Sequence, residues 1–83
     1  MNFHNKYIKF KVNPEIKSLI IKKYTTVRHF ADKIGYTESM LSHVLSGRRM
    51  IYPWMKEDFI LFLEIPMGEE RKYFEVYNDR KVS

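Results

Sequence analysis

The segment of residues 30–49, FADKIGYTESMLSHVLSGRR, constrains the fold of this chain most strongly. It places a small residue, Ala31, four positions before Gly35, within a run that otherwise has helical spacing. Glycine enters the left-handed conformation without a Cβ clash, so Gly35 predicts the end of a first helix. Thr37 is a favourable N-cap for a second helix, which Gly47 is expected to close. The segment therefore predicts two short helices joined by a tight turn.

The residues around this turn have the sizes that two closely crossing helices require. Ala31 is small enough for the second helix to pass close to the first, where a larger side chain would hold the two apart. Five apolar residues are spaced to fill the wedge between the helices: Phe30, Ile34, Tyr36, Leu41 and Val44. An ordinary corner between two helices shares the spacing of Ala31 and Gly35, but not all of these positions. The pattern favours a helix-turn-helix over residues 26–46, whose second helix is presented to the major groove of DNA.

The same segment resembles the lambda-repressor-like (Xre/Cro) family of DNA-binding domains. The resemblance rests on Phe30-Ala31, Gly35, Thr37-Glu38-Ser39, Leu41-Ser42 and Leu45-Ser46-Gly47-Arg48-Arg49, in this order. It extends loosely over residues 14–77, and the tail GEERKYFEV is similar to the last helix of some bacterial members. The chain departs from the family at Val27 and Glu38, where many members have glutamine, and in the strand-like residues 6–12. The resemblance implies a five-helix domain like those of phage and mobile-element repressors.

Besides the helix that Thr37 caps, one strand and three helices are expected before the C-terminal segment. Residues 6–12, KYIKFKV, alternate apolar and polar side chains as a half-buried strand does, and the sequence does not clearly name their partner. The helices are predicted over residues 14–24, 27–34 and 53–64. Asn13 is expected to cap the first of these, with Pro14 at its first position. Trp54 is expected to belong to the core.

The C-terminal segment, residues 67–79, is compatible with two structures. Its residues Met67, Glu70, Phe74 and Tyr77 keep helical spacing. Residues 73–77 also alternate as a strand would, and such a strand would pair with residues 6–12. We expect the helix. The fold class predicted is mainly α: a single five-helix lambda-repressor-like helix-turn-helix domain over residues 1–83, with an N-terminal strand-like arm at residues 6–12.

Charge is distributed unevenly along the chain. Residues 1–56 hold eleven Lys/Arg and three Asp/Glu, a net charge of +8, whereas residues 57–83 hold four Lys/Arg and seven Asp/Glu, a net charge of −3. Such asymmetry suggests that one face meets a polyanion, although lysine also serves simply to keep small domains soluble. Cysteine is absent, which excludes disulfides, and no apolar stretch suits secretion or a membrane span. A location in the bacterial cytosol is expected.

Ten polar residues are predicted to contact DNA. Base contacts are expected from Glu38, Ser39, Ser42 and His43, on the second helix of the motif. Serine donates and accepts hydrogen bonds, and glutamate accepts from the amino group of cytosine. Alternatively, Glu38 serves only as a favourable charge at a helix N-terminus, and His43 is a solvated surface residue. Phosphate contacts are expected from Thr26, Arg28, Thr37, Arg48, Arg49 and Tyr52.

The predicted function is a sequence-specific DNA-binding transcriptional regulator, a Cro-type repressor of double-stranded operator DNA. A homodimer is expected because one motif reads only a few base pairs. No cofactor or metal is expected, and an enzyme is not, because the three histidines lack nearby nucleophiles or a third metal ligand. The alternative is a protein–protein interaction module on the same fold, such as an antitoxin, antirepressor or adaptor. The missing glutamines and the acid at Glu38 favour that alternative.

Overall fold

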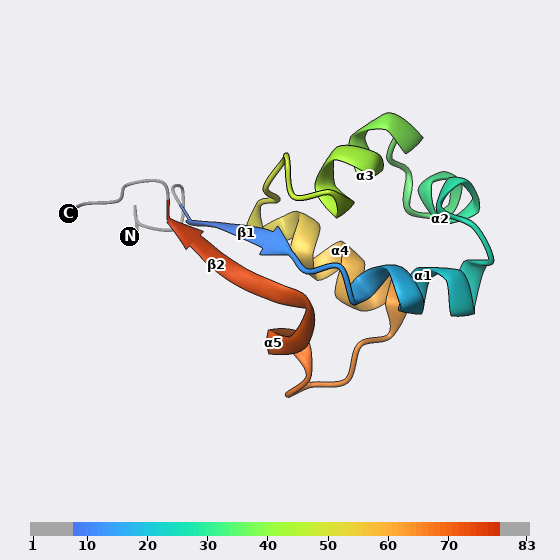
Figure 1. Cartoon of the computed structure of the whole chain (residues 1–83). Coiled ribbons are helices and arrows are strands. Elements are labelled where there is room, and N and C mark those ends of the chain that lie inside the picture. The colour runs from blue at the N-terminus through green and yellow to red at the C-terminus, as the bar shows by residue number, and fades with distance from the viewer. Residues whose placement is uncertain (1–7, 79–83) are drawn as a thin grey trace.

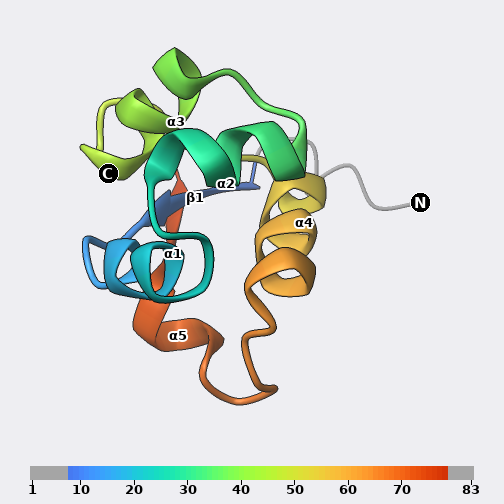
Figure 2. The ribbon, with the colours of Figure 1, turned by 90° about the vertical axis from the view of Figure 1, so that its right-hand side faces the viewer.

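The computed structural model describes residues 8–78 and shows a mainly α arrangement of five helices with a two-stranded antiparallel sheet (Figure 1). The elements are β1 (Ile8–Val12), α1 (Ile16–Tyr24), α2 (Val27–Ile34), α3 (Glu38–Leu45), α4 (Pro53–Leu63), α5 (Glu70–Tyr73) and β2 (Phe74–Asn78). The longer helices gather together and the strands project away from them (Figure 1). α3 lies at the edge of the helical part, next to α2 (Figure 2).

Local signals set the bounds of α2 and α3 as predicted. The Oγ1 atoms of Thr26 and Thr37 each accept a hydrogen bond from the backbone amide three residues later, at 3.0 and 3.1 Å. Gly35 ends α2 with φ at 88°, a value in the left-handed region that glycine adopts without strain. The carbonyl oxygen of Ala31 accepts from the amides of both Gly35 and Tyr36, at 2.9 and 3.0 Å. The chain therefore reverses within a few residues and starts α3 at Glu38.

The predicted apolar wedge between α2 and α3 is confirmed as part of the core. Phe30, Ala31, Ile34, Leu41 and Val44 are buried, and Tyr36 is half-buried. Phe59 of α4 is fully buried at the centre of an aromatic cluster, with its ring 5.7 Å from that of Phe30 and 6.3 Å from that of Tyr36. These contacts fix α2 and the turn that follows it against α4.

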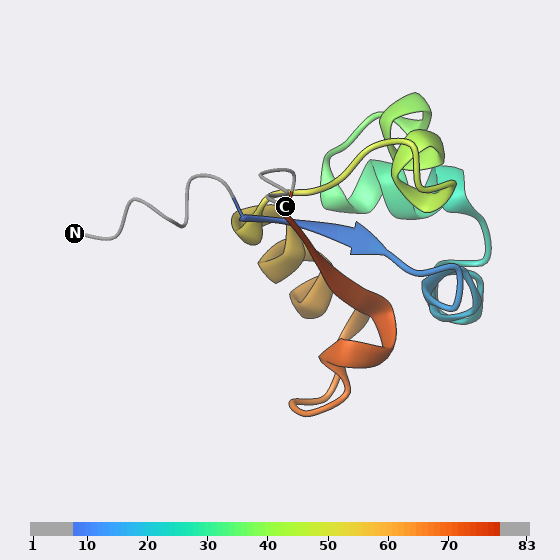
Figure 3. The same cartoon turned by 60° about the vertical axis from the view of Figure 1, so that its left-hand side comes forward.

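β1 is paired along both of its edges. On one edge it lies antiparallel to β2, with Phe10 opposite Val76. On the other edge, Phe10 exchanges two backbone hydrogen bonds with Ile51, at 2.8 and 2.9 Å. β1 thus lies between β2 and the loop that follows α3 (Figure 3). This attachment holds the loop that carries Arg48 and Arg49.

The predicted C-terminal helix is wrong beyond Tyr73. α5 has four residues, and the chain continues as β2, which pairs with β1. Tyr73 and Phe74 are neighbours in sequence, yet both are buried, because the change from helix to strand turns both side chains toward the core. A helix does not form here because β1 offers a row of backbone groups and an apolar face to residues 74–78. Residues 6 and 7 of the predicted first strand lie outside the described residues.

The start of α1 also differs from the prediction. Asn13 and Pro14 belong to a turn, and the helix begins at Ile16. The side chain of Asn13 does not cap the helix, because its Nδ2 donates instead to the carbonyl oxygen of Lys72 at 3.1 Å. Its backbone amide donates to the carbonyl oxygen of Tyr73 at 2.8 Å. Asn13 therefore ties the N-terminal part of the chain to α5.

Trp54 was predicted to lie in the core, and the structure places it on the surface. Its side chain is 61% exposed. The buried face of α4 is formed by Met55, Phe59 and Leu63, which follow one another at four-residue intervals. Trp54 lies about 100° away from Met55 around the helix axis and therefore faces away from that stripe.

Candidate functional site

The polar face of α3 is open to solvent. Its opposite face carries Leu41 and Val44, which are fully buried. The residues predicted to contact bases are all exposed: Glu38, Ser39, Ser42 and His43. Because residues three and four apart share a side of a helix, these four form one continuous surface. Ser46, directly after α3, extends that surface by one turn and is also exposed.

The residues predicted to contact phosphates are also exposed: Thr26, Arg28, Thr37, Arg48, Arg49 and Tyr52. Thr26 and Thr37 cap the first turns of α2 and α3, where backbone amides lack partners within the helix. The amides of Arg48 and Arg49 both donate to the carbonyl oxygen of His43, at 2.9 and 3.2 Å. The loop therefore folds back over the end of α3, and both arginines follow the polar face directly. Neither guanidinium forms a salt bridge with a carboxylate of residues 8–78.

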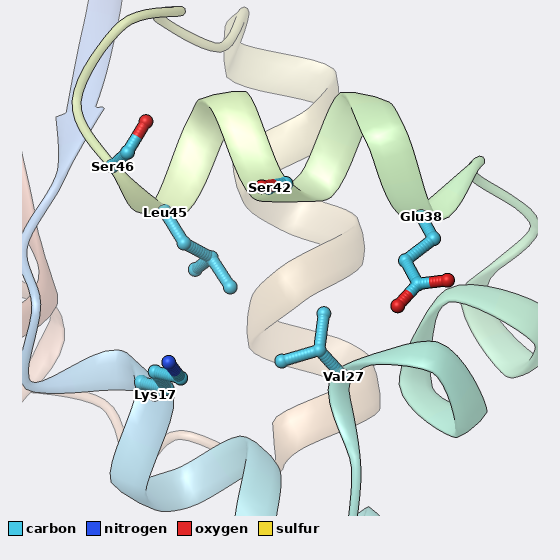
Figure 4. A pocket seen from close by; sticks show the side chains of 6 residues that line it. All are labelled: Lys17, Val27, Glu38, Ser42, Leu45 and Ser46. Carbon is cyan, nitrogen blue, oxygen red and sulfur yellow. The ribbon is translucent and has the colours of Figure 1, made fainter.

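A cavity of about 290 Å³ lies between α3 and the start of α2, with α1 on its far side (Figure 4). It is lined by Lys17, Val27, Glu38, Ser42, Leu45 and Ser46. Figure 4 shows the side chains of Leu45 and Val27 extending into the gap, with the Glu38 carboxylate at one end and Lys17 across it. The cavity therefore combines an apolar floor with one carboxylate and one ammonium. It widens the accessible surface beside α3 without giving that surface a net charge.

Three side chains near α3 were missed by the sequence analysis. Lys17 and Ser46 line the cavity just described. Lys11 lies against the end of α3, since a Cβ built on Gly47 would be 3.6 Å from its Cε atom. The two lysines come from β1 and α1, and only the fold brings them beside a helix far along the chain. The excess of cations in residues 1–56 was the only sequence signal for them.

Two other lysines of the first 56 residues are engaged away from α3. The ammonium of Lys23 pairs with the Glu64 carboxylate at 3.0 Å. The ammonium of Lys56 pairs with Glu70 at 3.2 Å and lies 4.4 Å from the centroid of the Phe10 ring. These contacts place both lysines against the acidic second part of the chain, so they add little to the charge around α3.

Tyr52 and Trp54 form an exposed aromatic pair at the start of α4. Their ring centroids are 6.2 Å apart and their planes differ by 13°, a stacked arrangement. The ammonium of Lys9 lies 5.7 Å from the centroid of the Tyr52 ring. Tyr52 is 39% exposed and Trp54 is 61% exposed. This pair is an apolar surface that follows the arginines in sequence.

A side-chain hydrogen bond links the turn that precedes α3 to α4. The hydroxyl of Tyr36 donates to a carboxylate oxygen of Asp58, on α4, at 2.8 Å. Burial raises the pKa of the Tyr36 phenol above its ordinary value, and the hydrogen bond and negative charge of Asp58 raise it further. The phenol therefore stays protonated and keeps donating at neutral pH.

Comparison with known proteins identified no relative of this chain. A scan against protein-family models, a search of curated proteins and a search of solved structures each found no match to the chain. Among residues 8–78, no helix has the length and apolar character needed to cross a bilayer. The same residues contain no group of three or more His, Asp or Glu side chains placed to share a metal ion.

Proposed function

We propose that this protein is a sequence-specific DNA-binding transcriptional regulator of the Cro type, in which α2 and α3 act as a helix-turn-helix. The observation that carries the proposal is the exposed polar face of α3, which ends at Arg48 and Arg49. A helix with its side chains is about 10–12 Å wide and the major groove is about 12 Å wide, so α3 is of a size to enter it.

The phosphate contacts would position the protein on the duplex. Arg48 and Arg49 directly follow the end of α3, and Lys11 lies against the same end. Lys17 lines the cavity next to α3. Cations at these places attract the phosphates that border the groove and release their counterions. The backbone amides that lack a partner in the first turn of α2, next to Thr26, are also suited to donate hydrogen bonds to an anion. None of these contacts distinguishes one sequence from another.

Side chains on the exposed face of α3 would then read base edges. Ser42 and His43 lie in the middle of the helix and offer both donors and acceptors. Glu38 accepts hydrogen bonds but is repelled by phosphate, so it favours a position facing the amino group of cytosine. Binding would repress transcription by covering promoter DNA, which needs no cofactor. Because one α3 reads only a few base pairs, the proposal includes two copies on an imperfect palindrome.

A protein–protein interaction module is the second candidate, and one observation favours it. Trp54 and Tyr52 form a stacked, exposed aromatic pair. Exposed tryptophan and tyrosine are typical anchors of protein interfaces, since they bury a large area at a small cost in side-chain entropy. In this alternative the fold would present the aromatic pair to a partner protein, and α3 would not enter DNA.

A binding titration separates the two candidates. Fluorescence anisotropy with labelled random duplexes in 50 mM salt should give micromolar binding or tighter. If about six phosphates are neutralised, the affinity should fall by roughly three decades between 50 and 200 mM salt. Folded protein that fails to bind any duplex at micromolar concentration in 50 mM salt would favour the interaction module.

Variants test which side chains contribute. Arg48→Ala combined with Arg49→Ala should weaken binding to all sequences by about tenfold to a hundredfold and flatten the salt slope by about two units. The matched control is Arg71→Ala with Lys72→Ala, which also removes two exposed cations but on α5, away from α3 (Figure 1). Equal losses from both pairs would contradict the proposed site. Once selection from random duplexes has defined an operator, Ser42→Ala should change the preference among sequences.

A further inference from the structure

The cavity beside α3 lies in a corner between helices. α1 and α3 both pack against α2 but make few contacts with each other, which leaves a space between them (Figure 4). Its volume of about 290 Å³ is close to the lower end of the range for ligand pockets, roughly 300–1,000 Å³. The cavity is therefore of a size to hold a small molecule.

The floor of this cavity is apolar. Val27 and Leu45 are half-buried and pack against the hydrophobic core. The part of each side chain that the core does not cover extends into the cavity (Figure 4). An occupant that covers this apolar area removes it from water, which is favourable when the occupant is itself apolar. The floor thus favours a ligand with an aliphatic chain.

Two opposite charges flank the apolar floor. The Glu38 carboxylate lies at one end of the cavity and Lys17 lies across it (Figure 4). Within residues 8–78, neither side chain forms a salt bridge or a side-chain hydrogen bond with another residue. They do not pair with each other either, so a ligand that meets both must carry its own charges apart.

We propose that this cavity binds an aliphatic zwitterion whose ammonium and carboxylate lie at opposite ends of a short carbon chain, that is, an ω-amino acid. Its ammonium faces Glu38, its carboxylate faces Lys17, and its methylene groups cover Val27 and Leu45. A ligand with a single charge leaves one of the two protein charges without a partner. An α-amino acid carries both charges at one end and therefore does not reach both sides of the floor.

An occupied cavity also changes the exposed face of α3. Glu38 and Ser42 line the cavity, and both are among the residues predicted to contact bases. The zwitterion covers part of both side chains and neutralises Lys17, so it competes with DNA. The protein thus releases its operator when the zwitterion is abundant. This regulatory part rests on the proposed function, whereas the binding site itself does not.

A titration without DNA tests the binding site. The probe is ε-aminocaproate, and NMR follows the backbone amide shifts of isotopically labelled protein. The shifts should saturate with a dissociation constant of about 1 mM, as expected for a ligand this small, and should be largest at Val27, Ser42 and Leu45. The matched control is norleucine, an isomer of the probe that carries both charges at one end. It should bind about threefold to tenfold more weakly. Equal binding of the two isomers, or no saturable shift around the cavity, would overturn the proposal.

Two substitutions test the two protein charges. Glu38→Gln keeps the length of the side chain and Lys17→Met nearly so, and each removes one charge from an exposed residue, so the fold should be retained. Each should weaken the binding of ε-aminocaproate by about threefold to tenfold. The matched controls are Glu57→Gln and Lys33→Met, which remove the same charges from exposed residues that do not line the cavity. Losses of the same size in the controls, or no loss in the two cavity variants, would overturn the proposal.

Competition with DNA tests the regulatory part. At ten times its dissociation constant, ε-aminocaproate should weaken the binding of duplex DNA by about tenfold, and norleucine at the same concentration should have a smaller effect. Neither isomer carries a net charge, so the two solutions screen the phosphates equally. Duplex binding that is unaffected by ε-aminocaproate would overturn the regulatory part. Failure to bind any duplex would contradict the proposed function, and with it the regulatory part, while the titration without DNA decides the binding site.

Discussion

At the scale of single residues, Tyr36 anchors the turn that precedes α3. Its hydroxyl donates to Asp58 at 2.8 Å, and its ring lies 6.3 Å from that of Phe59. Both partners belong to α4, so the turn before α3 is anchored to a helix that is distant in sequence. The exposed face of α3 depends on this anchor although Tyr36 does not itself belong to that face.

Replacing Tyr36 should lower stability and change its pH dependence. Tyr36→Phe removes one hydrogen bond to a charged acceptor and should lower the free energy of unfolding by about 1–2 kcal/mol at pH 7. The pKa of Tyr36 is raised above 10.0 in the folded protein, chiefly by burial. Below pH 10 the phenol is protonated in both states, so its contribution is fully present there. Above pH 10 the unfolded chain releases the proton first, so stability falls as pH rises.

Urea unfolding at pH 7, 9 and 11 measures both effects. The free-energy difference between the unmodified protein and Tyr36→Phe should shrink between pH 9 and pH 11, because the variant has no phenol at this position to titrate. Asp58→Asn is the control, since it keeps an acceptor for the phenol but removes the charge, and it should cost less stability than Tyr36→Phe. A difference that is unchanged at pH 11 would contradict the assigned pKa shift.

At the scale of elements, the bounds of α2 and α3 depend on a few residues at their ends. Two threonine caps start the helices, and Gly35 ends the first in the left-handed region. A Cβ built on Gly35 would meet nothing within 4 Å. Glycine is therefore favoured at this position because of its backbone conformation, since there is room for a larger side chain.

Substitutions at Gly35 should follow the cost of the left-handed conformation. Gly35→Ala should lower the free energy of unfolding by about 1–2 kcal/mol, because alanine is strained at positive φ. Gly35→Asn should cost less, because asparagine tolerates that conformation better than other non-glycine residues. Thermal unfolding followed by circular dichroism measures both variants. Equal costs for the two variants would mean that contacts of the side chain decide the effect.

The C-terminal segment shows how the secondary structure of one segment can depend on the segment that it pairs with. Residues 73–77 are compatible with helical spacing and with strand alternation, and the helix was the prediction. The structure has a helix only to Tyr73 and a strand from Phe74, because β1 lies alongside. Strand pairing is a long-range interaction, so local spacing does not specify it.

At the scale of the whole molecule, the two ends of the described chain complete a core formed mostly by the middle. Val12 of β1 and Phe74 of β2 are buried with the residues of α1 to α4. The rings of Phe74 and Phe59 are 6.2 Å apart in an edge-to-face arrangement. Small domains have little stability to spare, so we expect the helices to need these strands to stay folded.

Phe74→Ala should therefore affect the entire domain. Truncation of a buried phenylalanine costs about 3–5 kcal/mol, which approaches the total stability of a small domain. We expect a large loss of helical circular dichroism at 37 °C, including the signal from helices that do not contact Phe74. Leu61→Ala is the control, because Leu61 is 70% exposed and its truncation should change stability by less than about 0.5 kcal/mol. Retention of the folded spectrum in Phe74→Ala would show that the helices are stable without β2.

The sequence by itself determined α2, α3 and the turn between them, and the ten residues that it predicts to contact DNA are exposed. Their determinants are caps, a glycine and helical spacing, all of which act within a few residues. Only the tertiary structure decided that β2 pairs with β1, that Trp54 is exposed and that Lys11 and Lys17 lie beside α3. Each of these features depends on which segments meet in space, and backbone pairing and burial between distant segments leave no periodic pattern in either segment alone.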